Sequence, residues 1–312
     1  MLLHELNDFA DLIAVTAREQ KIDPGLVEKD YWIMHCLWGL QQLGFAFELK
    51  GGTSLSKGFR LIDRFSEDID ILIHPDSDLK YGPNHNKPPQ VAARKAFYDE
   101  LAQRIEIPGI TSVDRDAAFD DTRYYRSAGI RLVYTEVNRI PDGVKDGILL
   151  EVGFDQVAPN RAQTIASWAF DKALTSGLGD LTDNRAQNVL CYEPGYTLVE
   201  KLQTISTKFR IQQETRDMPV NFMRHYYDVY CLLQDDTVQE FIGSDAYNTH
   251  KAKRFRTADN PDLTSNEAFV LSDKTTRKLY AEAYRASHAL YYREQPEFGA
   301  ILTRLGEHLS RL

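Results

Sequence analysis

The N-terminal part of the chain carries apolar side chains at three- and four-residue spacing. This spacing predicts an amphipathic helix over residues 3–20 and a second helix over residues 26–43. Asp23 and Pro24 lie between them, where a capping acid followed by proline is typical of a helix start. Gly44 follows the second stretch, at the position where glycine commonly ends a helix.

Shorter apolar runs, bounded by glycine and polar residues, predict strands farther along the chain. The expected strands cover residues 45–50, 69–73, 129–135 and 147–154. Residues 74–92 have the composition of a loop, and residues 92–107 are expected to form a helix.

From residue 160 onward the pattern becomes mostly helical. The expected helices cover residues 196–210, 221–234, 273–291 and 296–311. We therefore predict an α+β (mixed α/β) fold, with a small mixed β-sheet core flanked by helices in residues 1–160 and a mostly helical domain in residues 161–312.

Composition places the chain among ordinary globular proteins. It has 312 residues, of which 43% are hydrophobic and 27% charged. No apolar stretch approaches the roughly 18–20 residues that span a bilayer. The N-terminus carries acids where a signal peptide carries Lys or Arg. We therefore expect a cytoplasmic monomer without membrane contact, with Cys36, Cys191 and Cys231 reduced in their apolar surroundings.

The net charge is −9, which argues against general coating of nucleic acid but leaves room for a local basic groove. Basic residues cluster in the C-terminal half. They are Lys201, Lys208, Arg210, Arg216 and Arg224, with four more within residues 249–256.

The stretch from Glu48 to Ile73 holds the candidate chemistry. A predicted strand stops at a glycine pair, a helix-compatible segment follows, and a second predicted strand begins at Asp68. Residues i and i+2 of a strand face the same way, so Asp68 and Asp70 present two carboxylates on one face. A glycine turn at a helix N-terminus favours phosphate, and a carboxylate pair favours magnesium. Together they predict a site for a metal-bound nucleoside triphosphate.

Other charged residues are weaker candidates for the same site. Glu151 is a lone acid inside an apolar run, and it is either an edge-strand residue facing solvent or a third metal carboxylate. Lys201 is the first candidate for a cation that binds triphosphate, and Lys57, Arg60 and Arg64 are further candidates. The alternative for each of these four is a solvated surface charge.

Several motifs, in this order along the chain, resemble the AbiEii/AbiGii nucleotidyltransferase toxins of the DNA polymerase β-like nucleotidyltransferase superfamily. The motifs are E-K-D-Y-W at 28–32, G-G-T-S-L-S-K at 51–57, R-F-S-E-D-I-D-I at 64–71, T-L-V-E-K-L at 197–202, R-H-Y-Y-D-V-Y at 224–230 and R-E-Q-P-E-F-G-A-I-L at 293–302. The resemblance spans nearly the whole chain.

The resemblance implies roles for the glycine turn. Gly51, Gly52 and Ser54 are expected to contact the triphosphate, and Thr53 and Lys57 belong to the same nucleotide-binding segment. The mostly helical domain is expected to complete the nucleotide cleft.

The resemblance also implies roles for the acids. Asp68 and Asp70 are expected to bind Mg²⁺. Glu151 is expected to be the third carboxylate of the superfamily, which can act as a base for the acceptor hydroxyl, although Asp155 is a second acid only four residues away.

In the C-terminal half the resemblance implies that Lys201 contacts phosphate or nucleotide, with Asp228 beside it as a nucleotide contact or as support. One position departs from the family pattern, which commonly reads R-D-x-Y-D. Here His225 replaces the first acid.

The activity implied is magnesium-dependent transfer of a nucleoside monophosphate from an NTP to RNA, notably a tRNA 3′ end. The implied setting is phage defence, with a cognate antitoxin as partner. The basic cluster would line an RNA groove, with Tyr226, Tyr227 and Phe255 either stacking on bases or packing in the core.

Two other functions stay open. The enzyme could act on a small molecule or a protein hydroxyl, which the acidic net charge favours, or the chain could be a non-catalytic nucleotide-binding module. The presence of Asp68, Asp70, Lys201 and Asp228 together argues against the module.

Overall fold

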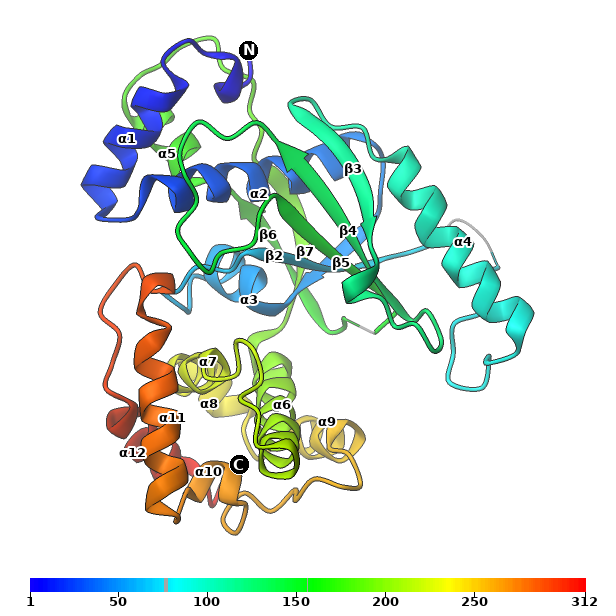
Figure 1. Cartoon of the computed structure of the whole chain (residues 1–312), viewed down its shortest axis with the longest axis vertical. Coiled ribbons are helices and arrows are strands. Elements are labelled where there is room, and N and C mark those ends of the chain that lie inside the picture. Colours follow the sequence, from blue (N-terminus) through cyan, green and yellow to red (C-terminus); the bar gives the residue numbers. More distant parts are fainter. Residues whose placement is uncertain (76–77, 156) are drawn as a thin grey trace. The chain divides into compact units, whose positions relative to one another are not determined.

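The computed structural model describes residues 1–75, 78–155 and 157–312. The chain divides into two compact units (Figure 1). The first unit comprises residues 1–59 and 65–192, and the second comprises residues 60–64 and 193–312. Each unit has its own secondary structure and its own core.

The first unit is built on a mixed seven-stranded sheet in the order β3-β4-β5-β2-β1-β7-β6. The strands are β1 (Phe47–Lys50), β2 (Asp68–Ile73), β3 (Ile110–Asp116), β4 (Ser127–Tyr134), β5 (Ile148–Gly153), β6 (Asn160–Ile165) and β7 (Ala186–Tyr192). Strand β2 is antiparallel to β1 and parallel to β5. Strand β5 is therefore internal to the sheet, between β4 and β2.

The central strands alternate apolar and polar residues, and the apolar face is fully buried. Leu49, Ile69, Ile71, Leu150 and Val152 all lie on this face with no exposed surface. Helix α2 packs against β5 and β7, and Figure 1 shows it running across the sheet. Burial of this face leaves the polar face for chemistry.

Six helical elements surround this sheet in the first unit. They are η1 (Leu3–Glu5), α1 (Phe9–Gln20), α2 (Pro24–Gln42), α4 (Pro88–Arg104), η3 (Ala117–Phe119) and α5 (Trp168–Thr175). Helix α2 begins as predicted, because Asp23 accepts a hydrogen bond from the Gly25 amide and Pro24 occupies the first helical position. Two short elements follow β1 directly, namely α3 (Gly51–Thr53) and η2 (Ser54–Gly58), and η2 is π-helical.

The described residues of the second unit form helices and one isolated antiparallel β-bridge, between Arg64 and Tyr291. The helices are α6 (Pro194–Thr215), α7 (Arg224–Leu232), α8 (Asp236–Phe241), α9 (Asp245–Arg254), α10 (Glu267–Val270), α11 (Lys274–Ala286), η4 (His288–Leu290) and α12 (Phe298–His308). Helix α6 is central and packs against α7, α8, α9 and α10. Its core residues Leu198, Leu202 and Ile205 are fully buried, which fits the predicted apolar stripe.

The predicted mixed α/β fold is confirmed, and three strands were not predicted. Strands β3 and β6 are mostly polar and show no apolar run, whereas β7 ends in the short apolar stretch 189–192, from which no strand was predicted. Pairing of β7 with β1 brings residues 160–192 into the first unit by their contacts, whereas the sequence set the domain boundary after residue 160. Within the described residues, no helix is long and apolar enough to cross a membrane.

Candidate active site

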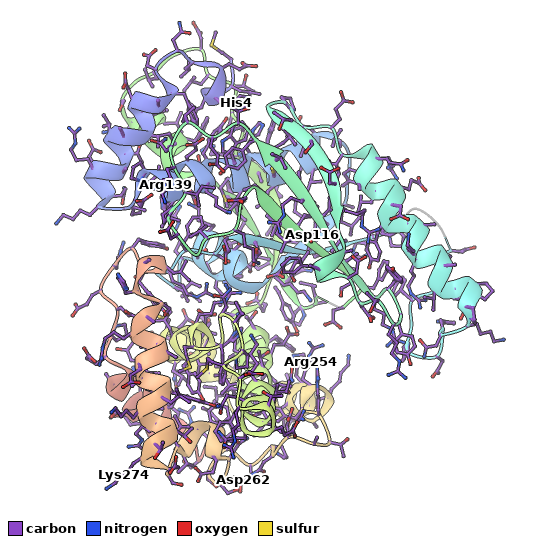
Figure 2. All side chains as sticks on the ribbon, viewed as in Figure 1. His4, Asp116, Arg139, Arg254, Asp262 and Lys274 are labelled. Atoms are coloured by element: carbon purple, nitrogen blue, oxygen red, sulfur yellow. The ribbon has the colours of Figure 1, made fainter. Side chains whose placement is uncertain are left out.

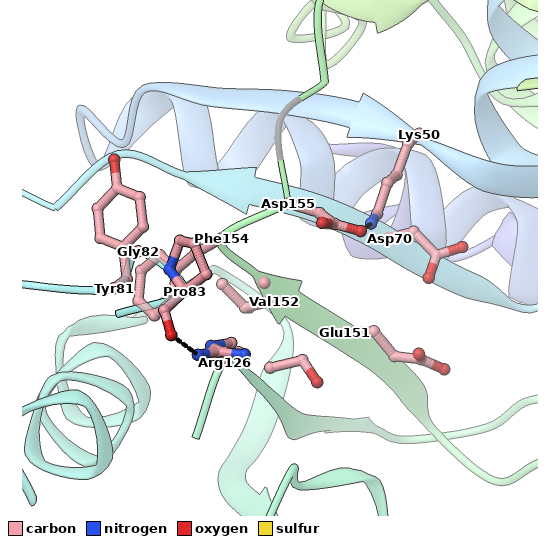
Figure 3. Close-up of a pocket in the computed structure, with 12 residues that line it drawn as sticks. Lys50, Asp70, Tyr81, Gly82, Pro83, Arg126, Glu151, Val152, Phe154 and Asp155 are labelled. Carbon is pink, nitrogen blue, oxygen red and sulfur yellow. Dashed lines mark hydrogen bonds and ion pairs between the residues drawn. The ribbon is translucent and has the colours of Figure 1, made fainter. Parts of the chain in front are cut away.

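The two acids of the D-x-D motif lie in β2, as predicted, and their side chains share the polar face of the sheet. Asp70 is the register partner of Lys50 on β1 and of Glu151 on β5. Figure 3 shows the Asp70 and Glu151 carboxylates pointing to the same side of their neighbouring strands. Because β5 is an internal strand, the alternative interpretation of Glu151 as an edge-strand residue is wrong.

Asp70 and Glu151 line a cavity of about 600 Å³ in the first unit (Figure 3). Its charged residues include the Lys50–Asp155 ion pair, with a nitrogen–oxygen distance of 3.7 Å. Its remaining lining residues include an aromatic pair and a guanidinium. They are Tyr81 stacked on Phe154, with ring centroids 4.8 Å apart, and Arg126, which donates to Asn86 Oδ1 at 2.7 Å. The cavity therefore combines acids, cations and rings, as a nucleotide-sized ligand needs.

Gly51 is fitted closely against Asp70. Its φ is +75°, a left-handed conformation that favours glycine. A Cβ atom at Gly51 would lie 2.1 Å from Asp70 Oδ2, so any side chain there would force the Asp70 carboxylate to move. The first glycine of the pair thus allows the turn to lie directly against the D-x-D motif.

The remaining residues of the glycine turn face inward. Gly52, Thr53 and Ser54 are all buried, and the Thr53 hydroxyl donates to the Asp68 carbonyl oxygen at 2.6 Å. Thr53 and Ser54, the two hydroxyl-bearing residues of the turn, have no exposed surface. Lys57 turns to Asp30, with 2.9 Å between Nζ and Oδ1.

Asp68 has a cationic partner. Lys145 Nζ donates to Oδ1 at 2.8 Å and to Oδ2 at 2.9 Å, and only 5% of Asp68 is exposed. Among residues 1–75, 78–155 and 157–312, no three His, Cys, Asp or Glu side chains are close enough together to hold a metal ion. The donors on the polar face fit a cation that takes one or two carboxylates and completes its shell with phosphate oxygens and water, as magnesium does.

Lys201 and Asp228 belong to the second unit, where they are in direct contact. Lys201 Nζ lies 3.0 Å from Asp228 Oδ2, and the fully buried Asp228 also receives Arg64 Nε at 2.6 Å and a second Arg64 nitrogen at 2.7 Å. Burial would raise the pKa of Asp228, but Arg64 and Lys201 outweigh it and lower the pKa to about 2. Asp228 is therefore a fixed anion.

The motif around Asp228 has a positive environment and an apolar core. Burial, and then repulsion by Lys201, Lys208 and Arg224, lowers the pKa of His225 well below its usual value, so His225 is neutral. Tyr226 and Tyr227 are packed in the core of this unit rather than available for stacking on bases. Phe255 is half-buried.

Three residues near the acids were not predicted from the sequence, namely Lys50, Arg126 and Lys145. Lys50 directly precedes the glycine pair, so its place at the end of a strand beside the D-x-D motif could have indicated it. Arg126 and Lys145 lie in connecting segments or at a strand start, where no periodic pattern marks them.

Comparison with known proteins gave a family match and a similar solved structure. The family model for the nucleotidyl transferase AbiEii toxin of type IV toxin–antitoxin systems matches residues 33–304. A solved structure of an antigenic nucleotidyltransferase-like protein from Paracoccidioides brasiliensis is 16% identical, with 77% of this chain and 92% of that chain covered and a TM-score of 0.39. No curated protein matches.

The family match makes the chain a nucleotidyltransferase, and the carboxylates beside the glycine turn are its candidate site. It belongs to the AbiEii nucleotidyltransferase toxin family, whose model matches most of its length. A toxin of this kind implies a cognate antitoxin.

Proposed function

We propose that this protein transfers a nucleoside monophosphate from an NTP to the 3′ end of an RNA, such as a tRNA, and releases pyrophosphate. The observation that carries the proposal is the register of Asp70 with Glu151, on the wall of a cavity beside the Gly51 turn. Such a transfer needs few chemical groups from the protein, because positioning and electrostatics supply most of the rate.

Asp68 and Asp70 are the proposed ligands of Mg²⁺, with phosphate oxygens of the NTP completing its coordination. When bound, magnesium supplies charge neutralisation on the phosphates and on the leaving pyrophosphate. Glu151 is proposed to accept the proton of the acceptor hydroxyl. It is preferred to Asp155, because Asp155 follows the end of β5 and pairs with Lys50.

The proposed nucleotide contacts are Gly51, Gly52, Thr53 and Ser54, through their backbone amides. Lys57 is a weaker candidate, because its ammonium is shared between Asp30 and the face of the Trp168 ring, 4.3 Å away. Lys201 is proposed to contact the phosphate or nucleotide. Asp228, beside it, is proposed to contact the nucleotide or to support Lys201.

Two features support RNA as the acceptor. The cavity beside the acids contains the Tyr81–Phe154 stack and the cations Lys50 and Arg126, which suit bases and phosphates. In the second unit, burial and the neighbouring Arg224 and Lys201 lower the pKa of Lys208 to about 8. Burial is the larger cause, and the smaller contribution of Arg224 and Lys201 indicates neighbouring cations whose repulsion an RNA backbone would reduce.

The proposal is tested with each α-³²P-labelled NTP, Mg²⁺ and total RNA, followed by separation of RNA, protein and small molecules. We expect label on RNA, its loss when the RNA 3′ ends are oxidised with periodate, and its loss in Asp70→Asn. Asp114→Asn is the control, because Asp114 is an exposed acid on β3 of the same sheet and does not line the cavity.

The other outcomes favour other functions. Label on a small molecule or on protein would support the alternative acceptors, which the net charge of −9 favours. Binding of NTP without any transfer would indicate a non-catalytic module. Growth arrest on expression, relieved by Asp70→Asn, would support a phage-defence toxin acting in the cytoplasm.

A further inference from the structure

Three consecutive charged residues in the middle of the first unit are almost completely buried. Glu28, Lys29 and Asp30 follow one another near the start of α2 and are 1%, 0% and 2% exposed. Charged residues are seldom buried to this extent unless each has a partner. These three also lie just before residues 33–304, which the family model matches.

Glu28 and Lys29 bind the two ends of one connecting segment, residues 137–147, which leads from β4 to β5. The Glu28 carboxylate accepts the amides of Val137 and Asn138 at 2.9 and 2.7 Å. The Lys29 ammonium donates to the carbonyl oxygens of Lys145 and Gly147, the latter at 2.8 Å. The Glu28 carboxylate and the Lys29 ammonium thus satisfy backbone amides and carbonyl oxygens of this segment. In return, both buried charges have hydrogen-bond partners.

This segment brings Lys145 to Asp68. The Lys145 ammonium donates to both oxygens of the Asp68 carboxylate, its backbone amide donates to Glu67 Oε2 at 2.9 Å, and the Phe119 ring lies 4.7 Å from Nζ. Lys145 is thus held at its backbone by Lys29 and Glu67 while its side chain covers Asp68. A chain of contacts runs from the buried charges of α2 to the D-x-D motif.

We propose that Lys145 is a positioning residue that competes with a divalent cation for Asp68, and that Glu28 and Lys29 serve to hold it there. The inference rests on the proposed function, because it takes Asp68 as a cation ligand. An ammonium and a divalent cation cannot share two carboxylate oxygens without strong repulsion at this distance. Lys145 therefore fixes Asp68 when no cation is present and gives up the carboxylate when one binds.

The test measures Mn²⁺ binding to the full-length protein without nucleotide, by the loss of the free Mn²⁺ electron paramagnetic resonance signal. Lys145→Ala is expected to tighten Mn²⁺ binding about tenfold, because a charge-assisted pair that the metal must break is gone. Lys145→Arg keeps a cation on Asp68 and should stay within about twofold to threefold of wild type. Glu28→Gln, which loosens the segment, should tighten binding by a smaller factor.

Arg139→Ala is the matched control. Arg139, labelled in Figure 2, is a cation of the same segment with a side chain that is 87% exposed, and it pairs with Asp142 at 3.0 Å. Its removal should leave Mn²⁺ affinity unchanged.

Two results separate failure of this inference from failure of the proposed function. If Asp68→Asn weakens Mn²⁺ binding but Lys145→Ala leaves it unchanged or weaker, Lys145 does not compete and the inference is overturned. If Asp68→Asn leaves Mn²⁺ binding unchanged, or if no variant binds Mn²⁺, the assignment of Asp68 as a cation ligand is overturned with it.

Discussion

Asp68 and Asp228 are both buried acids with cationic partners, but they are held in different ways. Asp68 is paired with one lysine, which comes from a connecting segment and has a quarter of its side chain exposed. Asp228 is held by Arg64 and Lys201, inside the core of the second unit, with no exposed surface. At Asp68 the lysine can be exchanged for another cation. At Asp228 the two ion pairs hold residues 60–64 to helices α6 and α7. We infer that Asp228 serves mainly as support.

The largest expected effect is on stability and follows from replacing Asp228. Asp228→Asn leaves the Arg64 guanidinium buried without its counter-charge, which costs about 3–5 kcal/mol of stability. Asp68→Asn should cost only about 1 kcal/mol, because Lys145 can turn towards solvent. Urea unfolding followed by far-UV circular dichroism measures both.

Tryptophan fluorescence provides the control for that measurement. Trp32, Trp38 and Trp168 all belong to the first unit, so their signal reports on that unit alone. Asp228→Asn should leave the tryptophan transition less affected than the circular dichroism transition. Equal destabilisation by the two substitutions would contradict the distinction between an exchangeable and a fixed acid.

The next largest expected effect is on the rate of transfer and concerns Gly51 in the first unit. Gly51→Ala places a methyl group on Asp70 Oδ2 and should lower the rate of transfer about 100-fold, as displacement of a reacting group by about 1 Å does. Gly44→Ala is the matched control. Gly44 has nearly the same φ, +78°, but open space around its Cβ position, so it carries the backbone strain without the collision. Equal loss of activity in both variants would indicate backbone strain alone.

The smallest effect concerns the cations of the second unit. The lowered pKa of Lys208, about 8, means that the folded protein releases this proton at a lower pH than the unfolded chain. Stability should therefore rise between pH 8 and about pH 10, by roughly 2 kcal/mol relative to Lys208→Met. Circular dichroism melts across this range measure the difference, and parallel pH profiles for the two proteins would show that Lys208 is not desolvated.

The local sequence pattern predicted that the two acids of β2 share one face, because the alternation of side chains along a strand depends only on neighbouring residues. Asp68 and Asp70 follow from it, and so does the start of α2 at Asp23. The pairing of Asp70 with Glu151 joins two strands that are neighbours in the sheet but far apart in the sequence, so the sequence left two interpretations of Glu151 open.

Residues whose place depends on tertiary contacts could not be predicted in this way. Lys145 lies in a segment without periodicity, and its place beside Asp68 depends on contacts of its backbone with Lys29 and Glu67. Strand β6 is mostly polar and the apolar stretch of β7 is short, so they are recognisable mainly by the pairing of β6 with β7 and of β7 with β1.

The central claim is that the polar face of the sheet carries out the transfer, and Asp70→Asn tests it most directly. The rate of label transfer from an α-³²P-labelled NTP under single-turnover conditions is measured for a variant whose urea midpoint equals that of wild type. We predict a loss of about 10³-fold, because charge stabilisation at the reacting phosphate is removed. A folded Asp70→Asn protein that transfers label within about threefold of the wild-type rate would contradict the account.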